Sequence, residues 1–198
     1  MPAAAIDLNA RLLADDIVET ADERDALAAV RDVTGERDGP FERHGIRCFL
    51  LAEELAAERS LSVDRELLLI AGLLHDIGLY PAASRGGVYV TDGKEFARDL
   101  LAGRPGWADE ERLTRCLLAI ERHHELRSQW DAGVEVEVLR RVDLTEVSSA
   151  LVRWGIDRSR IQAINAAVPR DGFYRAVGGL LGHALVERPL TIPRIFIR

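Results

Sequence analysis

Residues 67–76 read LLLIAGLLHD, an uninterrupted apolar run that ends in an imidazole and a carboxylate, His75 and Asp76. An unpaired charge in so apolar a setting is very costly, whereas a divalent metal ion would satisfy both groups at once. The sequence therefore predicts a polar site that is built into an apolar helical core. Further candidate ligands lie elsewhere in the chain: His44, His123, His124 and Asp143.

The composition is that of one globular domain. A chain of 198 residues can bury one core, and we expect a single domain over residues 1–198. Apolar residues make up 47% and charged residues 30%, which is far from a disordered composition. The formal net charge of -7 creates no basic field for nucleic acid or an anionic membrane, so we expect neither as a partner.

Two further features indicate a cytoplasmic protein. The first residues lack the basic end and the apolar core of a signal peptide. No apolar stretch approaches the ~20 residues that span a bilayer. The two cysteines, Cys48 and Cys116, lie inside apolar helical patterns, so we expect buried thiols and no disulfide.

The spacing of apolar residues predicts an all-α fold, a single helical bundle. Position 44 and the apolar positions 48, 51 and 55 follow one another at intervals of four, three and four, which marks one face of a helix. The predicted helices cover residues 41–58, a stretch from a cap at Ser62 or Asp64 up to Pro81, and residues 94–103, 109–124, 135–153, 158–167 and 173–186.

Polar residues interrupt the apolar faces of these helices at His44, His75 and Asp143. A single histidine on an apolar face is more often a hydrogen-bonded core residue. A single inward aspartate more often caps a helix or pairs with an arginine, and Arg140 and Arg141 are close to Asp143 in sequence. Several such residues in one small domain each need a partner, because each adds a desolvation cost. Imidazole and carboxylate together suit a divalent ion such as Zn, Mn, Fe, Ni or Co.

The order of these residues resembles the HD superfamily of metal-dependent hydrolases, an all-helical fold named for its His-Asp doublet. The likeness includes LLHDIG at residues 73–78 and RVD at 141–143, and it covers roughly residues 40–150. The resemblance implies a small-molecule substrate and one divalent metal ion. Its implied ligands are His44, His75, Asp76 and Asp143.

Details within the superfamily discriminate between its branches. Cyclic-dinucleotide phosphodiesterases usually carry a lysine at the position of Leu79, and a Gly-Tyr-Pro after the His-His-Glu that residues 123–125 form here; this chain lacks both. Asp92 stands near the position where two-metal members often supply another histidine. Three short segments resemble a cyanamide-hydratase-like branch: DIGL at 76–79, VTDG at 90–93 and PRDGF at 169–173.

A divalent metal ion in this site would lower the pKa of its bound water towards neutrality and so supply a hydroxide for attack on a substrate. Our first candidate reaction is hydrolysis of a phosphoester of a small molecule or nucleotide. The alternative is cyanamide-hydratase-like hydration of a small nitrile or amide. A third reading is a metal-binding sensor domain without catalysis.

Two histidines are the candidates for proton transfer, since imidazole titrates near pH 7. His124 shares a helix face with Leu117 and Ile120, so we expect it to face the pocket, with His123 second. Alternatively, the doublet is a solvated helix end that complements the helix dipole. If His123 or His124 bound a second ion, phosphoester hydrolysis would gain support.

Two basic residues are candidates for substrate contact. Lys94 is the only lysine in the chain, and it lies near a predicted helix start, where a cation opposes the dipole. It would contact an anionic substrate or Asp92, or it is an exposed surface residue. Arg47, one turn after His44, would face the mouth of the site or pair with Glu54 or Glu42.

Overall fold

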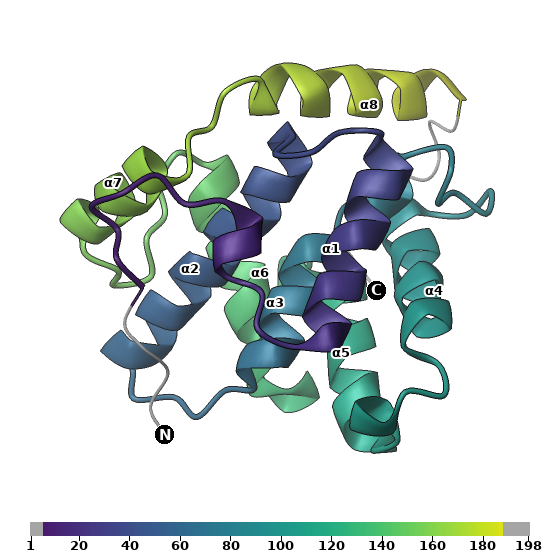
Figure 1. Cartoon of the computed structure of the whole chain (residues 1–198), viewed down its shortest axis with the longest axis horizontal. Helices are drawn as coiled ribbons and strands as arrows, with labels where there is room; N and C mark the ends of the chain where they lie inside the picture. Colours follow the sequence, from purple (N-terminus) through teal and green to yellow (C-terminus); the bar gives the residue numbers. More distant parts are fainter. Residues whose placement is uncertain (1–5, 188–198) are drawn as a thin grey trace.

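The computed structural model describes residues 6–187, with side chains described as far as residue 180, and its architecture is all-α (Figure 1). The prediction of an all-helical fold is confirmed, since the described part of the chain forms no strand. The α-helices are α1 (Ala21–Thr34), α2 (Pro40–Glu58), α3 (Arg65–Leu74), α4 (Tyr89–Leu101), α5 (Glu110–Arg122), α6 (Val134–Val147), α7 (Arg158–Ala167) and α8 (Phe173–Glu187). The described residues also form four 3-10 turns: η1 (Ala14–Asp16) precedes α1, and η2 (Ile77–Leu79), η3 (Pro105–Trp107) and η4 (Trp130–Ala132) lie between later helices.

Helices α2 and α3 form the centre of the bundle. Helix α2 packs on α3 and α6, while α1 and α5 enclose α3, and α4 packs on α5. Figure 1 shows α8 along one edge of the molecule, above the ends of α1 and α2, and it contacts α2 and η2. None of the described helices is long and apolar enough to span a membrane.

Helix α3 contains the apolar run of residues 67–74. All eight residues from Leu67 to Leu74 are buried, as expected for a helix that is apolar on every side and lies at the centre of a bundle. The Asp64 side chain caps the helix by accepting a hydrogen bond from the Leu67 amide. The cysteines Cys48 and Cys116 are buried and unbridged, which confirms the prediction of free thiols.

Two glycines let α2 and α3 touch backbone to backbone. A Cβ atom at Gly45 would lie 2.6 Å from the Gly72 carbonyl oxygen, and one at Gly72 would lie 3.1 Å from the Gly45 oxygen. His44 adjoins the first glycine, and His75 follows the second by three residues. The close approach of the two helices therefore brings the two imidazoles together.

We expect Gly45→Ala to destabilise the protein by about 1–3 kcal/mol, because the new methyl group must push α3 away. Urea unfolding measures this loss. Gly178→Ala in α8 is the matched control, since no described atom lies within 4 Å of a Cβ atom there. The control should be neutral or stabilising by up to about 1 kcal/mol, because alanine favours helix. Equal stability of Gly45→Ala and the wild type would contradict the contact.

The predicted helix boundaries are wrong at several places. The helix through the doublet ends at Leu74, so His75 is its C-cap, and η2 follows. Helix α4 begins at Tyr89 instead of Lys94. Helix α6 ends at Val147 instead of residue 153, because Ser149 and Ala150 adopt positive φ angles of 53° and 63°.

An acidic residue in α6 joins that helix to the loop before it. The buried Glu137 accepts hydrogen bonds from Arg140, from Arg141 and from the Gln129 amide. Burial alone would raise the pKa of Glu137, but these donors outweigh it and lower the pKa to about 2. Arg140 is itself buried, so the pair is an internal ion pair that fixes α6.

Candidate metal centre

Four side chains from three helices converge inside the bundle. His44 comes from α2, His75 and Asp76 from the end of α3, and Asp143 from α6. The His44 Nε2 atom lies 3.0 Å from His75 Nε2, 3.6 Å from Asp76 Oδ2 and 3.3 Å from Asp143 Oδ1. The His75 Nε2 atom lies 3.4 Å from the same Asp76 oxygen and 3.7 Å from the same Asp143 oxygen.

These separations suit ligands that share one ion. With metal–nitrogen bonds of about 2.0–2.1 Å, neighbouring ligand atoms lie roughly 3.0–3.4 Å apart in octahedral or tetrahedral geometry. Asp143 Oδ1 is buried, and no described group donates a hydrogen bond to it. A buried carboxylate oxygen without a donor is costly, and a cation would satisfy it. The residues therefore fit a divalent metal ion.

The doublet His123-His124 borders the same cluster. His123 Nε2 lies 3.6 Å from Asp76 Oδ1, and His124 Nδ1 lies 3.4 Å from Asp143 Oδ2. The two imidazoles lie at the C-terminal end of α5, where His123 is the C-cap, and each approaches a different carboxylate of the cluster. His123 is fully buried, whereas the His124 side chain is 23% exposed. His124 thus lies against the cluster as expected, and His123 does so as well; which of them transfers a proton stays a prediction.

Three overlapping groups of possible metal ligands result. Each group offers at least three atoms that lie within 4.8 Å of one another. The groups are His44, Cys48, His75 and Asp143; His75, Asp76 and His123; and His123, His124 and Asp143.

Two of the histidines have their tautomer fixed by a backbone carbonyl. His75 Nδ1 donates to the Gly72 oxygen at 2.8 Å, and His123 Nδ1 donates to the Ile120 oxygen at 2.7 Å. A carbonyl can only accept, so the proton sits on Nδ1 and the lone pair of Nε2 faces the cluster. This is the form in which imidazole binds a metal.

The electrostatics of the metal-free cluster favour bound protons on some histidines. Burial alone would lower the pKa of His44, but Cys48, Glu146 and Asp143 outweigh it and raise the pKa well above its usual value. Burial also opposes ionisation of Asp143, yet His44 and the other histidines hold its pKa well below the usual range. A metal would have to displace protons from this cluster.

His124 behaves in the opposite way. Burial, together with the neighbouring His123, lowers the pKa of His124 to about 4. Its imidazole is therefore neutral at pH 7 and able to accept a proton.

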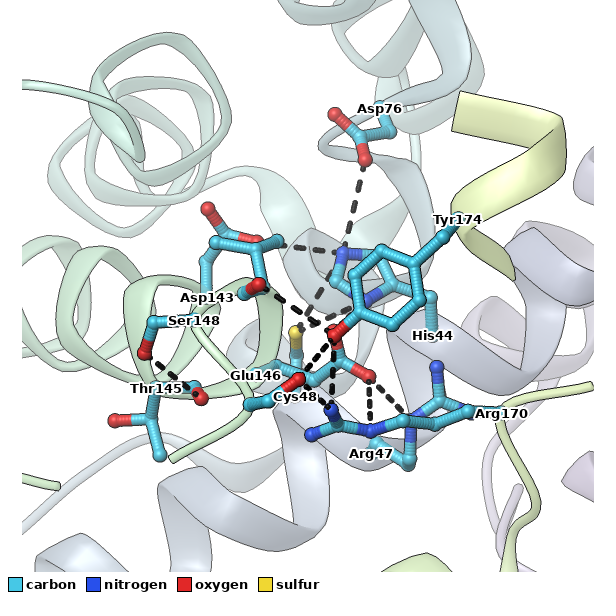
Figure 2. A network of polar contacts seen from close by, with 12 residues as sticks. His44, Arg47, Cys48, Asp76, Asp143, Thr145, Glu146, Ser148, Arg170 and Tyr174 are labelled. Atoms are coloured by element: carbon cyan, nitrogen blue, oxygen red, sulfur yellow. Dashed lines mark hydrogen bonds and ion pairs between the residues drawn. The ribbon is translucent and has the colours of Figure 1, made fainter. Parts of the chain in front are cut away.

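A buried carboxylate that the sequence reading missed lies behind His44. The Glu146 Oε2 atom lies 3.1 Å from His44 Nδ1, and its Oε1 atom accepts a hydrogen bond of 2.6 Å from Arg47 Nε. Figure 2 shows Glu146 and Asp143 near the His44 ring, with Arg47 and Arg170 close to Glu146. The one signal in the sequence is the spacing of three residues after Asp143, which places both carboxylates on one face of α6.

Both predictions for Arg47 are wrong. The side chain is buried, so it does not face the mouth of the site, and its partner is Glu146 instead of Glu54 or Glu42. Glu54 pairs with Arg160 and Glu42 with Arg31.

Aromatic side chains line the cluster. Phe173, the first residue of α8, stacks on His44 with ring centroids 4.3 Å apart. The Tyr89 hydroxyl lies 3.5 Å from His123 Nε2, and burial with the nearby Asp76 carboxylate raises its pKa well above the usual value. Neither aromatic residue was singled out from the sequence, since a single ring on an apolar face normally indicates core packing.

Lys94 and Asp92 engage other groups. Lys94 Nζ lies 2.8 Å from Glu121 Oε1, and no contact described in the structure joins it to the metal cluster. Asp92 is buried and accepts hydrogen bonds from the amides of Arg85 and Gly87, so it shapes the loop before α4. A contact between Lys94 and substrate stays a prediction.

Comparison with protein families agrees with this geometry. The family described as HD domain matches residues 41–150, which is more than half of the chain and contains His44, the His75-Asp76 doublet and Asp143. Comparison with curated proteins finds no significant match.

Proposed function

Because this chain belongs to the HD-domain family, we propose that it is a metal-dependent hydrolase whose ion is held by His44, His75, Asp76 and Asp143. The main support for this proposal is that these side chains converge on Asp143 Oδ1, a buried oxygen that accepts no hydrogen bond of good geometry from a described group. When bound, a divalent ion would act as a Lewis acid and would lower the pKa of the attacking water.

The two histidines of the doublet would divide the remaining work. His124 is partly exposed and neutral at pH 7, so it would accept a proton at its imidazole during attack. His123 is fully buried with its Nε2 lone pair towards Asp76, which suits a ligand of a second ion.

We favour a phosphoester of a small molecule or nucleotide as the substrate. The supporting observation is that both histidines of the doublet face carboxylates of the first ion's ligand set, which gives a second group of donors beside the first. Two adjacent ions can neutralise the charge of a phosphoryl group, so the pocket would need few cationic side chains.

One observation favours the alternative, hydration of a small nitrile or amide. Near the cluster, Arg47 and Arg170 both engage Glu146, and the aromatic residues Phe173 and Tyr89 contact its histidines. Aromatic neighbours and arginines that already pair with a carboxylate suit a small neutral compound better than a phosphate that depends on arginine.

The test is a substrate screen on metal-defined protein. The chain is stripped with a chelator and reloaded separately with Zn, Mn, Fe, Ni or Co, and each form is assayed with phosphomonoesters, cyclic nucleotides, cyanamide and simple amides. Metal-dependent release of phosphate from a monoester, or formation of a nucleoside monophosphate from a cyclic nucleotide, supports the first candidate. Urea formation from cyanamide without hydrolysis of either phosphoester supports the alternative. A protein that binds none of these ions would overturn the proposal for both.

A further inference from the structure

The histidines of the metal centre do not all have the same kind of acceptor for the proton on Nδ1. His75 and His123 are the C-caps of α3 and α5, where the last carbonyls of a helix have no intrahelical donor. Each ring donates to the carbonyl three residues earlier, at 2.8 and 2.7 Å. The helix end thus supplies the partner that orients each ring.

His44 has no such carbonyl. It is the fifth residue of α2, and nearby carbonyls in the body of a helix already accept hydrogen bonds from the amides four residues on. Its Nδ1 atom instead lies 3.1 Å from a carboxylate oxygen of another helix, Glu146 Oε2 in α6, and 3.9 Å from Cys48 Sγ in its own helix. The carboxylate is the nearer and the stronger acceptor. That buried oxygen has no hydrogen bond of good geometry from any described group, so the Nδ1 proton of His44 would satisfy it.

Glu146 is itself firmly held. Its side chain is completely buried, and its other oxygen, Oε1, lies 2.6 Å from Arg47 Nε and 3.3 Å from Arg170 Nε. Arg47 is tied in turn to the backbone, since its Nη1 donates to the Pro169 oxygen at 3.0 Å. These contacts fix the carboxylate behind the ring of His44 (Figure 2).

Helix α6 therefore contacts both nitrogens of one imidazole. Asp143 Oδ1 lies 3.3 Å from Nε2, and Glu146, one turn later, faces Nδ1. We propose that Glu146 is a positioning residue of the metal centre, which holds the proton of His44 on Nδ1 and leaves Nε2 to bind the ion. This inference rests on the proposed metal-binding function.

The first experiment measures metal affinity. Zinc and cobalt binding to the full chain are titrated in competition with a chromophoric chelator, for the wild type and for Glu146→Gln. We expect the variant to bind either ion about 10- to 100-fold more weakly, as is typical when a partner of a ligating histidine is changed. The matched control is Glu23→Gln, which removes a buried carboxylate that pairs with Arg65 and contacts no histidine. The control should keep wild-type affinity.

The second experiment is decided by the wild type alone and is extended to the variant. Nitrogen NMR of the imidazoles in the zinc-loaded wild type should show the His44 proton on Nδ1, with slow exchange, and the metal on Nε2. In Glu146→Gln the same proton should exchange faster. A proton on Nε2, or zinc on Nδ1, would overturn the inference even if the variant failed to fold.

The outcomes separate this inference from the proposed function. If the wild type binds metal and Glu146→Gln binds within about twofold of it, Glu146 does not position His44, while the hydrolase proposal stands. If the wild type binds neither zinc nor cobalt, both fail. Weaker binding by Glu146→Gln and Glu23→Gln alike would indicate a general loss of stability and would also overturn the inference.

Discussion

Asp143→Ala is expected to abolish divalent-metal binding and, with it, any metal-dependent hydrolysis. Its carboxylate is the group that approaches both His44 and His75 through one oxygen and His124 through the other. Without it, the imidazoles face a cavity with one carboxylate fewer, and we expect a loss of about 2–4 kcal/mol in the free energy of unfolding. Elemental analysis of the purified variant should find almost no bound metal, against at least one ion per chain in the wild type.

The control for this prediction is Asp99→Ala, which removes an exposed carboxylate of α4. Its metal content and stability should stay close to those of the wild type, because exposed ion pairs contribute little. A stoichiometric ion in purified Asp143→Ala would show that Asp143 is not a ligand.

Glu137→Ala should produce the largest loss of stability, about 3–5 kcal/mol. The substitution leaves the buried Arg140 without its carboxylate and frees the Gln129 amide at the end of a loop. Chemical denaturation at pH 7 measures the loss. Glu111→Ala is the control, since that carboxylate is 82% exposed and pairs with Arg115 on the surface, and it should cost less than about 1 kcal/mol.

The same pair gives an expected pH dependence. Folding lowers the pKa of Glu137 from 4.5 to about 2, so the ionised carboxylate stabilises the folded state fully above pH 4.5. This stabilisation is lost as the pH falls towards 2. The difference in stability between wild type and Glu137→Ala should therefore shrink across that range, and a difference that is constant down to pH 2 would contradict the role of the charge.

The sequence predicted the fold because most helices show helical spacing of apolar residues and several begin at a side-chain cap. The apolar run before His75 could only be a central helix, and Asp64 marked its start. Helix ends were less predictable, since the positive φ angles of Ser149 and Ala150 leave no signal in residue type. The doublet His123-His124 was expected to face the site mainly through His124, and both imidazoles lie near a carboxylate of the cluster.

The proposed metal ligands were predictable from their order along the chain, whereas the residues that support them were not. His44, the His75-Asp76 doublet and Asp143 lie together as the family resemblance implies. Glu146 was missed because its partner Arg47 is 99 residues away in sequence, and helical spacing reports only local neighbours. Such a pairing becomes visible only when α2 and α6 are placed side by side.

The contact between Gly45 and Gly72 has a consequence for how this protein tolerates change. The two helices that carry His44 and His75 meet through main-chain atoms at these glycines. The distance between the helix axes there therefore does not depend on a side-chain rotamer. Leucine, isoleucine and valine elsewhere in the core can be exchanged at modest cost if the total volume is kept. Such exchanges would leave the spacing of the two imidazoles unchanged, and the interior could diversify widely around a metal centre that does not move.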